Sequence, residues 1–210
     1  MSGRFVSLEG IDGSGKSTQA RLLAERLRAG GCDTVLTREP GGAPGAEDIR
    51  RLLVEGAPER WSAETEILLF TAARRDHLER TIGPALERGA WVVSDRFADS
   101  TRVYQGATRG DLRALVDRIH DAAIGREPDI TLVIDLAPEA AMARLAERQG
   151  SEDRFERFGL PFQQALRGGY AALARDFPER VRLIDGHGTE AEVAARVWAA
   201  LAAATGDASA

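Results

Sequence analysis

Hydrophobic and polar positions along the chain follow two alternating patterns. Short apolar runs, typical of buried strands, occur at residues 4–8, 34–37, 90–94, 130–136 and 181–184. Longer stretches in which apolar residues recur every three or four positions predict helices at 17–28, around 49–53, and at 64–88, 112–119, 139–148, 162–177 and 190–204. Gly83-Pro84 interrupts the stretch 64–88, so we expect that helix to bend there or to divide into two.

The alternation of strands and helices predicts an α/β fold in which helices cover both faces of a parallel sheet. No repeat or linker divides the chain, so we expect one domain over residues 1–210, with a frayed tail at 205–210. Ligands of such sheets bind at the carboxyl ends of the strands. The polar residues that follow the predicted strands, at 9–18, 38–42, 95–105 and 185–189, are therefore the candidates for a site.

The composition argues against several classes of function. The 210 residues carry a net charge of −5, which disfavours a broad electrostatic grip on nucleic acid or on an anionic membrane. No apolar run approaches the length of a membrane-spanning helix, and residues 1–9 show no apolar core of a signal peptide. The single cysteine, Cys32, excludes an internal disulfide and a thiolate cluster for a metal. We expect a cytoplasmic protein with no nucleic-acid or membrane partner.

Lysine is almost absent from this chain. Of 28 Lys and Arg residues, only Lys16 is a lysine, and asparagine does not occur. A drift in composition that replaces lysine by arginine explains the general pattern. A compact ammonium and a planar guanidinium are not interchangeable, however, so the retained lysine indicates a position at which arginine cannot replace lysine.

Residues 10–17 fit the phosphate-binding pattern G-x-x-x-x-G-K-[ST]. The glycines allow backbone N–H groups to turn toward a phosphate, and the start of the following helix adds partial positive charge. In this pattern Lys16 reaches the β- and γ-phosphates, and the Ser17 hydroxyl binds Mg²⁺. An ordinary glycine-rich turn is the alternative, but the strand before the motif and the helix after it favour the phosphate loop. The predicted nucleotide-binding residues are Gly10, Ile11, Asp12, Gly13, Ser14, Gly15, Lys16, Ser17 and Thr18.

The phosphate-binding loop indicates a nucleoside triphosphate but not what is done with it. GTPases usually carry N-K-x-D to read the base, and this chain has no asparagine. Motor ATPases usually end a hydrophobic strand in Asp-Glu, whereas the run 90–94 is followed by Asp95-Arg96. A carboxylate and then a guanidinium suit water ligands of Mg²⁺ at Asp95 and a second phosphate at Arg96. A surface ion pair is the alternative for these two residues.

Four further segments resemble the thymidylate kinase family in their order and spacing. They are Thr-Arg-Glu-Pro-Gly-Gly at 37–42, Leu-Leu-Phe-Thr-Ala-Ala-Arg at 68–74, the segment 93–106 and Asp-Arg-Phe-Glu at 153–156. The resemblance implies a P-loop nucleoside monophosphate kinase fold, with a five-stranded parallel sheet, helices on both faces and a short lid at about 148–158. It also implies phosphorylation of dTMP to dTDP by ATP and Mg²⁺, in dTTP biosynthesis. Similar enzymes are homodimers, and the apolar Ile67 and Leu68 are compatible with such a contact.

The resemblance assigns contacts to dTMP that suit the side chains concerned. Phe70 would stack on the thymine ring, and Arg74 would hydrogen-bond a thymine carbonyl. Arg38 and Arg96 would grip the phosphate with forked donors. Tyr104 would close on the deoxyribose where a ribonucleotide needs room for its 2′-hydroxyl. The expected dTMP contacts are Arg38, Glu39, Pro40, Phe70, Arg74, Arg96, Ser100, Thr101, Tyr104 and Gln105, with a cis bond before Pro40.

The resemblance also implies which residues serve phosphoryl transfer. Position 13 is glycine, where eukaryotic-type members of the family carry an arginine and bacterial-type members carry lid arginines instead. Arg154 is the first lid candidate and Arg148 the second, so the chain resembles the bacterial type. Asp12 would touch the 3′-hydroxyl of the sugar and the Mg²⁺-phosphate region. The expected catalytic residues are Asp12, Lys16, Arg96, Arg148 and Arg154, with Ser17 and Asp95 on the metal.

Two alternatives remain open on the sequence. Another P-loop nucleoside monophosphate or deoxynucleoside kinase would share the loop and the fold. A regulatory nucleotide-binding protein would keep the loop and transfer no phosphate. No residue at 185–189 is a strong reader of adenine, and we expect His77 and His120 to be structural or at the surface.

Overall fold

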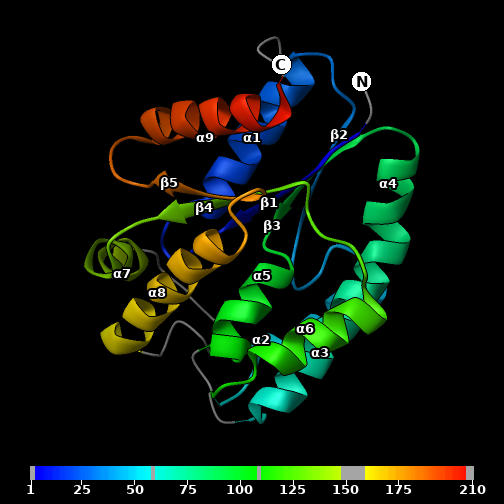
Figure 1. Ribbon diagram of the computed structural model, residues 1–210, viewed down its shortest axis with the longest axis vertical. Helices are drawn as coiled ribbons and strands as arrows, with labels where there is room; N and C mark the ends of the chain where they lie inside the picture. The colour runs from blue at the N-terminus through cyan, green and yellow to red at the C-terminus, as the bar shows by residue number, and fades with distance from the viewer. Residues whose placement is uncertain (1–2, 58–59, 108–109, 148–158, 207–210) are drawn as a thin grey trace.

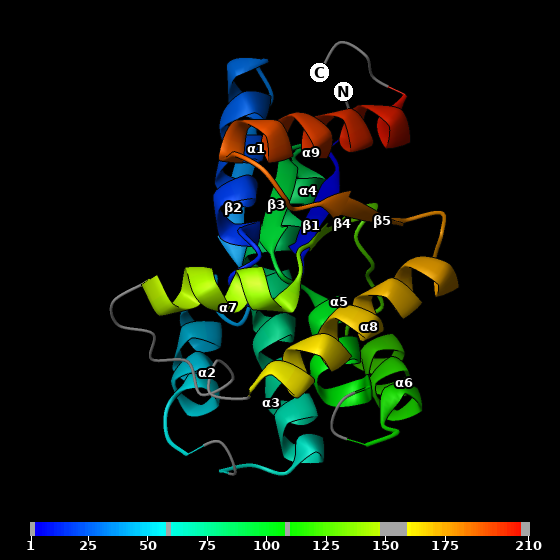
Figure 2. The same ribbon diagram turned by 90° about the vertical axis from the view of Figure 1, so that its left-hand side faces the viewer.

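The computed structural model describes residues 3–57, 60–107, 110–147 and 159–206. In these residues the core is one sheet of five parallel strands in the order β2-β3-β1-β4-β5 (Figure 1, Figure 2). The strands are β1 (Phe5–Glu9), β2 (Thr34–Arg38), β3 (Trp91–Asp95), β4 (Ile130–Asp135) and β5 (Val181–Asp185). They coincide with the five apolar runs, so the predicted five-stranded parallel sheet is confirmed.

Helices connect successive strands and lie on both faces of the sheet (Figure 1). Two described segments are π-helical, η1 (Leu78–Ile82) and η2 (Arg102–Ala107). No helix among the described residues has the length and apolar character needed to cross a membrane. The α-helices of this part of the chain are α1 (Lys16–Ala29), α2 (Pro44–Val54), α3 (Ala63–His77), α4 (Gly83–Glu87), α5 (Ala98–Thr101), α6 (Arg113–Ala123), α7 (Pro138–Glu147), α8 (Leu160–Asp176) and α9 (Glu190–Thr205).

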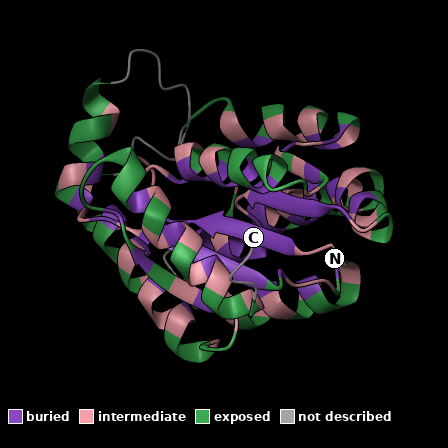
Figure 3. Cartoon of the chain, turned by 90° about the horizontal axis from the view of Figure 1, so that it is seen from above, coloured by how far each residue is buried: buried purple, intermediate pink, exposed green. Residues whose placement is uncertain are grey.

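The central strands are buried on both faces, whereas the edge strands are not. Every residue of β1 is buried, as are all residues but the last of β3 and of β4 (Figure 3). The edge strands β2 and β5 also carry exposed residues. Parallel strands that are covered by helices on both sides favour apolar residues on both faces, which is why they form nearly continuous hydrophobic runs in the sequence.

Side chains of β1 alternate between two cores. Val6 and Leu8 pack on one face in a cluster that includes Val197 of α9. Phe5 packs on the opposite face with Phe97, whose ring meets it edge-on with 4.8 Å between the ring centroids. This alternation is the two-residue period of a strand. It confirms that helices cover both faces of the sheet.

The long helix predicted at 64–88 is divided by a π-helical segment that ends directly before Gly83-Pro84, near the expected position. α3 ends at His77, η1 spans the next five residues and α4 begins at Gly83. Pro84 has no N–H to donate to the preceding turn. The wider π turn precedes this gap, because the Gly83 N–H donates to the carbonyl of Leu78 rather than to that of the residue four positions back.

Hydrophobic spacing does not predict α5. Asp99 holds this helix in place through a buried cluster of charged residues. Its carboxylate accepts hydrogen bonds from Arg180 Nη1 at 2.6 Å, from Arg102 Nη1 at 2.9 Å and from the Thr131 hydroxyl at 2.9 Å. Burial raises the pKa of Asp99, but the hydrogen bond and charge of Arg180 and the charge of Arg102 outweigh burial and lower it. The ionised carboxylate therefore stabilises the fold.

Asp99→Asn is expected to lower the free energy of unfolding by about 3 kcal/mol at pH 7, because Arg102 and Arg180 lose their most buried anionic partner and keep only more exposed carboxylates such as that of Glu127. A pKa that is lower in the folded state gives stability that is present above the unfolded pKa of about 3.9 and is lost as the pH falls through the folded value. The difference between wild type and variant should therefore shrink as the pH is lowered from about 5 to about 3.

Urea unfolding at several pH values measures this difference. The control is Asp48→Asn, because Asp48 is paired with Arg51 at the surface, where both side chains are more than half exposed. We expect that control to change stability by less than about 0.5 kcal/mol. A loss for Asp99→Asn that stays constant across the pH range would contradict the assigned role of its ionised form.

Candidate active site

Three glycines of the phosphate-binding loop adopt backbone conformations that other residues avoid. Gly10, Gly13 and Gly15 have φ angles of 140°, 80° and 96°. Gly15 directly precedes α1, whose first turn contains no acidic residue. The positive end of the helix dipole therefore faces the loop without a carboxylate in that turn, as a phosphate site requires.

Gly13 lies directly against α7. A Cβ atom on Gly13 would be 2.2 Å from the carbonyl oxygen of Ala141 and 2.9 Å from Leu145 Cγ. Close-packed backbone atoms of a helix do not yield that much space. The packing explains why the position is glycine, and it leaves no room for an arginine at this point of the loop.

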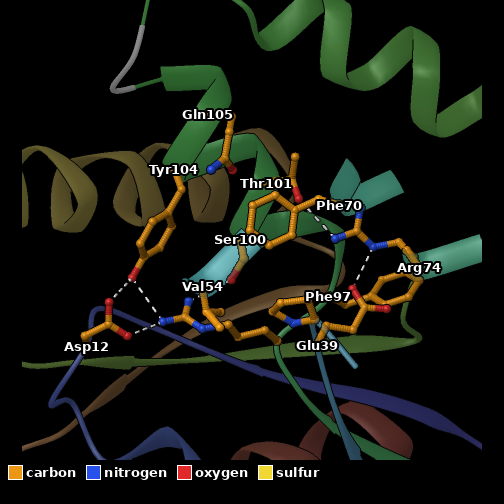
Figure 4. A pocket seen from close by; sticks show the side chains of 12 residues that line it. Asp12, Glu39, Val54, Phe70, Arg74, Phe97, Ser100, Thr101, Tyr104 and Gln105 are labelled. Atoms are coloured by element: carbon orange, nitrogen blue, oxygen red, sulfur yellow. Dashed lines mark hydrogen bonds and ion pairs between the residues drawn. The ribbon is translucent and has the colours of Figure 1, made fainter. Parts of the chain in front are cut away.

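Asp12 links the phosphate-binding loop to Arg96. Its carboxylate accepts a hydrogen bond from Lys16 Nζ at 3.1 Å. It also accepts one from the Tyr104 hydroxyl at 2.9 Å and pairs with Arg96 Nη2 (Figure 4). Burial raises the pKa of Asp12, but the charges of Lys16 and Arg96 outweigh burial, so the pKa lies well below its usual value. One carboxylate thus holds together two cations that can bind phosphates.

Arg96 lies at the centre of these contacts in an uncommon backbone conformation. Its φ angle is 75°, the only positive value among the described residues other than glycine. Its Nη1 donates to Ser100 Oγ at 2.9 Å, and its Nη2 donates to the Tyr104 hydroxyl at 3.0 Å. Such conformations persist where the surroundings hold the residue, and they are concentrated at functional sites.

Glu9, next to Arg96, falls in the candidate range 9–18, but no role was predicted for it. Its buried carboxylate accepts hydrogen bonds from the Phe97 N–H at 2.7 Å, the Ser100 hydroxyl at 2.5 Å and the Tyr170 hydroxyl at 3.0 Å. Burial is the largest influence on Glu9 and raises its pKa. The residue fixes the start of α5, and its only signal in the sequence is a charge at the end of an apolar run.

A pocket beside Arg96 gathers all the expected dTMP contacts except Arg38. Its volume is about 460 Å³, including the open mouth. The Glu39–Pro40 bond is cis, as expected. Val54 and Phe97 also line the pocket and were not predicted, because an apolar residue in an apolar pattern gives no separate signal. The lining residues are Asp12, Glu39, Pro40, Val54, Phe70, Arg74, Arg96, Phe97, Ser100, Thr101, Tyr104 and Gln105 (Figure 4).

Arg74 is held firmly at one end of the pocket, opposite Tyr104 and Asp12 (Figure 4). Its Nε donates to Glu39 Oε2 at 2.8 Å, and its Nη2 donates to Thr101 Oγ1 at 3.0 Å. The side chain is only 3% exposed. These two bonds use Nε and Nη2, so Nη1 is the guanidinium nitrogen that they leave for a ligand.

Arg38 lies in a neighbouring cavity rather than in this pocket. It lines that cavity with Ser17 and Asp95, and its guanidinium pairs with Glu47 at 3.0 Å. Arg38 therefore does not line the pocket that contains Arg96, although β2 pairs Arg38 with Asp95, the neighbour of Arg96 in the chain. Asp95 Oδ1 is buried without a hydrogen-bond partner among the described residues. Ser17 and Asp95 thus offer oxygen atoms to the same space, which fits the donor set that Mg²⁺ prefers.

Another cavity, of about 750 Å³, joins the phosphate-binding loop to the loop after β5. Arg144 of α7 lines this cavity, a role that was not predicted. Its Nη1 lies close to the phosphate-binding loop, 3.8 Å from where a Cβ on Gly15 would be. The exposed His187 bonds to Asp185 at 2.7 Å and is not among the lining residues. The lining residues are Gly13, Ser14, Gly15, Thr18, Gln19, Arg144, Gly186, Gly188, Thr189, Glu190 and Val193.

A comparison with known protein families shows to which family a chain with this loop and this pocket belongs. The sequence model of the family described as "Thymidylate kinase" matches residues 8–197, which include the loop, the pocket and α7. The chain belongs to the thymidylate kinase family. Of the residues that the resemblance to thymidylate kinases assigns to transfer, Arg148 and Arg154 lie outside the described residues, as does the whole expected lid at 148–158.

Thymidylate kinases of other organisms resemble this chain over nearly its whole length. The thymidylate kinase of Dinoroseobacter shibae is 70% identical over 202 residues, which are 96% of this chain and 98% of that protein. The thymidylate kinase of Ruegeria pomeroyi is 66% identical over 196 residues, or 93% of each chain. The crystal structure of thymidylate kinase from Ehrlichia chaffeensis matches with a TM-score of 0.76 at 35% identity, over 96% of this chain and 99% of that one. The expected nucleoside monophosphate kinase fold is thereby confirmed.

Proposed function

We propose that this member of the thymidylate kinase family, which phosphorylates dTMP to dTDP with ATP, binds dTMP in the pocket between Arg74 and Tyr104. The observation that carries the assignment is the junction at Asp12. The same carboxylate contacts Lys16 of the phosphate-binding loop and both Arg96 and Tyr104 of the pocket. An acceptor bound in the pocket therefore lies beside the loop that binds the phosphates of the donor.

The base is recognised at the Arg74 end of the pocket. The flat ring of Phe70 suits stacking on a pyrimidine. A guanidinium only donates hydrogen bonds, so Arg74 favours a carbonyl and opposes an exocyclic amino group. Thymine has a carbonyl at C4 where cytosine has an amino group, and we assign Arg74 to that carbonyl. The pocket thereby selects thymine over cytosine.

The sugar and the acceptor phosphate lie at the Tyr104 end. Burial raises the pKa of Tyr104 well above its usual value, so the hydroxyl stays neutral and donates to Asp12. Its ring closes on the deoxyribose, and Asp12 meets the 3′-hydroxyl. Arg96 holds the phosphate with its forked donors. Arg38 would serve as a second phosphate contact after releasing Glu47.

Transfer depends on position and charge rather than on a covalent intermediate. Lys16 neutralises charge on the β- and γ-phosphates, and the cavity lined by Arg144 accepts the remainder of ATP. Ser17 and Asp95 are the residues that would hold Mg²⁺. When bound, this ion neutralises charge on the donor phosphates. We propose that the chain acts as one domain, with residues 148–158 as the lid that excludes water.

Substrate preference tests this assignment most directly. In a coupled assay of ADP release, we expect dTMP to be the best acceptor and dUMP to be weaker, because one methyl group is worth about 1–3 kcal/mol in an apolar pocket. dCMP and the purine monophosphates should be much poorer, and omission of Mg²⁺ should remove the activity. Lys16→Met protein, prepared in the same way, controls for a contaminating kinase. Faster phosphorylation of GMP or dCMP than of dTMP would exclude this use of the pocket.

We further propose that the chain forms a cytoplasmic homodimer through the surface of α2 and α3. Leu52 and Leu68 are 40% and 58% exposed on these neighbouring helices. Ile67 is fully buried in the core, so it does not contribute to such a contact as the sequence suggested. Sedimentation equilibrium of the purified chain tests the assembly, and fractionation of cells tests the location.

A further inference from the structure

A chain of polar contacts runs from the base end of the dTMP pocket to β2. Arg74 Nε donates to Glu39 Oε2, Glu39 Oε1 lies 3.0 Å from His77 Nδ1, and His77 Nε2 lies 2.7 Å from Thr37 Oγ1. Arg74, Glu39 and His77 are 3%, 6% and 0% exposed. A histidine without solvent contact thus joins the end of β2, the loop that follows it and α3.

The chemistry of these partners determines which nitrogen of His77 carries the proton. An ionised carboxylate only accepts hydrogen bonds, so Nδ1 is protonated and donates to Glu39. In the neutral ring, Nε2 then accepts a hydrogen bond from the Thr37 hydroxyl. With one oxygen held by His77 and the other by Arg74, the Glu39 carboxylate cannot rotate without losing a bond.

The same end of α3 and the turn after it also contact this loop and the start of α2. Asp76 Oδ2 accepts from the Ala46 N–H at 3.0 Å, and Thr81 Oγ1 donates to the Gly42 carbonyl at 2.7 Å. A Cβ on Gly42 would lie 2.5 Å from His77 Nε2, so the glycine leaves the space that the ring fills. Asp76 therefore binds the backbone of the first turn of α2, and Thr81 binds the backbone of the loop. The contact of His77 instead continues through Glu39 to the pocket.

We propose that His77 is a positioning residue for base recognition. By fixing the Glu39 carboxylate, it directs the guanidinium of Arg74 toward the thymine carbonyl. His77 is not among the residues that line the pocket, so it acts through Glu39. The inference rests on the proposed function, in which Arg74 contacts the base.

Two substitutions separate the two contacts of His77. His77→Asn places an amide N–H near the position of Nδ1 and keeps a donor for Glu39. His77→Gln places its amide near the position of Nε2, keeps the contact with Thr37 and loses the donor for Glu39. We expect His77→Gln to raise the KM for dTMP about tenfold and His77→Asn to raise it less than about threefold. The kcat and the KM for ATP should change less than about twofold in both.

A double-mutant cycle identifies the route by which His77 acts. Arg74→Ala removes the base contact, so in that background His77→Gln should raise the KM for dTMP less than about twofold further. Thr81→Val loosens the same loop without touching Glu39, and its effect should add to that of Arg74→Ala. His120→Gln alters another buried histidine, 4% exposed on α6, and should leave the KM for dTMP unchanged.

Equal effects of the Asn and Gln variants, or additivity of His77→Gln with Arg74→Ala, would overturn the proposal and leave the base contact of Arg74 in place. If Arg74→Ala alone does not change the KM for dTMP, the proposed base recognition fails, and the role of His77 fails with it. Should His77→Gln not fold, as judged by circular dichroism, Glu39→Gln removes the carboxylate through which His77 acts on Arg74. Additivity of Glu39→Gln with Arg74→Ala counts equally against the proposal.

Discussion

Lys16→Met is expected to lower kcat by about 10³-fold while the protein stays folded. The ammonium lies 3.1 Å from Asp12 and 3.4 Å from the carbonyl of Ile11, at the point where the phosphate-binding loop meets Arg96. Methionine keeps the length and apolar stem of this 9% exposed side chain but removes its charge. The loss should therefore fall on transfer of the phosphoryl group rather than on folding.

Lys16→Arg should lower kcat almost as much, although it keeps the positive charge. A guanidinium is planar and larger, and it presents its donors as a rigid fork instead of a compact point charge. Steady-state kinetics measures kcat, calorimetric titration checks that dTMP still binds, and circular dichroism checks folding. Arg88→Met, on a half-exposed side chain that pairs with Asp33, is the matched control with unchanged kcat. Near-normal activity of Lys16→Arg would refute the argument from the only lysine in the chain.

Replacing the lid arginines is expected to have the other large effect. Arginine supplied to a phosphoryl-transfer transition state contributes roughly 10³–10⁵ in rate. The contact of Gly13 with Ala141 of α7 excludes an arginine in the loop itself. The charge must then come from another segment, and Arg154 and Arg148 are the candidates in the sequence. We expect Arg154→Ala to lower kcat far more than it raises the KM for dTMP, because the contact is made mainly in the transition state.

Steady-state kinetics of Arg154→Ala, Arg148→Ala and the double variant measures this effect. Arg51→Ala, on the exposed surface of α2, is the control for loss of an arginine outside the site. The double variant should lose about 10³-fold in kcat. If it keeps the kcat of the wild type, the bacterial-type interpretation of the lid is wrong. Arg144, which lines the cavity beside the loop, would then be the next residue to test.

The regular elements could be predicted because burial imposes a simple period on them. The central strands are buried on both faces and are therefore largely apolar. The irregular elements could not be predicted in the same way. Pro84 signals a disturbed helix, but packing decides that the π turn lies at 78–82. The helical segment 98–107 carries polar residues whose partners come from elsewhere, as Asp99 pairs with Arg180.

The pocket and the phosphate-binding loop were predictable because they lie in continuous motifs. The residues that support them were not, because their roles depend on segments that are far apart in the sequence. Glu9 accepts a hydrogen bond from Tyr170, 161 positions away. His77 reaches Glu39 across 38 positions, and nothing in the sequence around either residue marks the contact. Arg38 shows the opposite case. Its motif predicted a role in binding the phosphate, but the motif did not predict that its guanidinium pairs with Glu47.

The contact between Gly13 and α7 also bears on how such enzymes diverge. The carbonyl oxygen of Ala141 lies where the side chain of any residue at position 13 would begin. A lineage with this backbone cannot acquire a loop arginine by a single substitution, because the new side chain would displace α7 before any gain in rate. Glycine at position 13 and the close packing of α7 against the loop are therefore features that depend on each other.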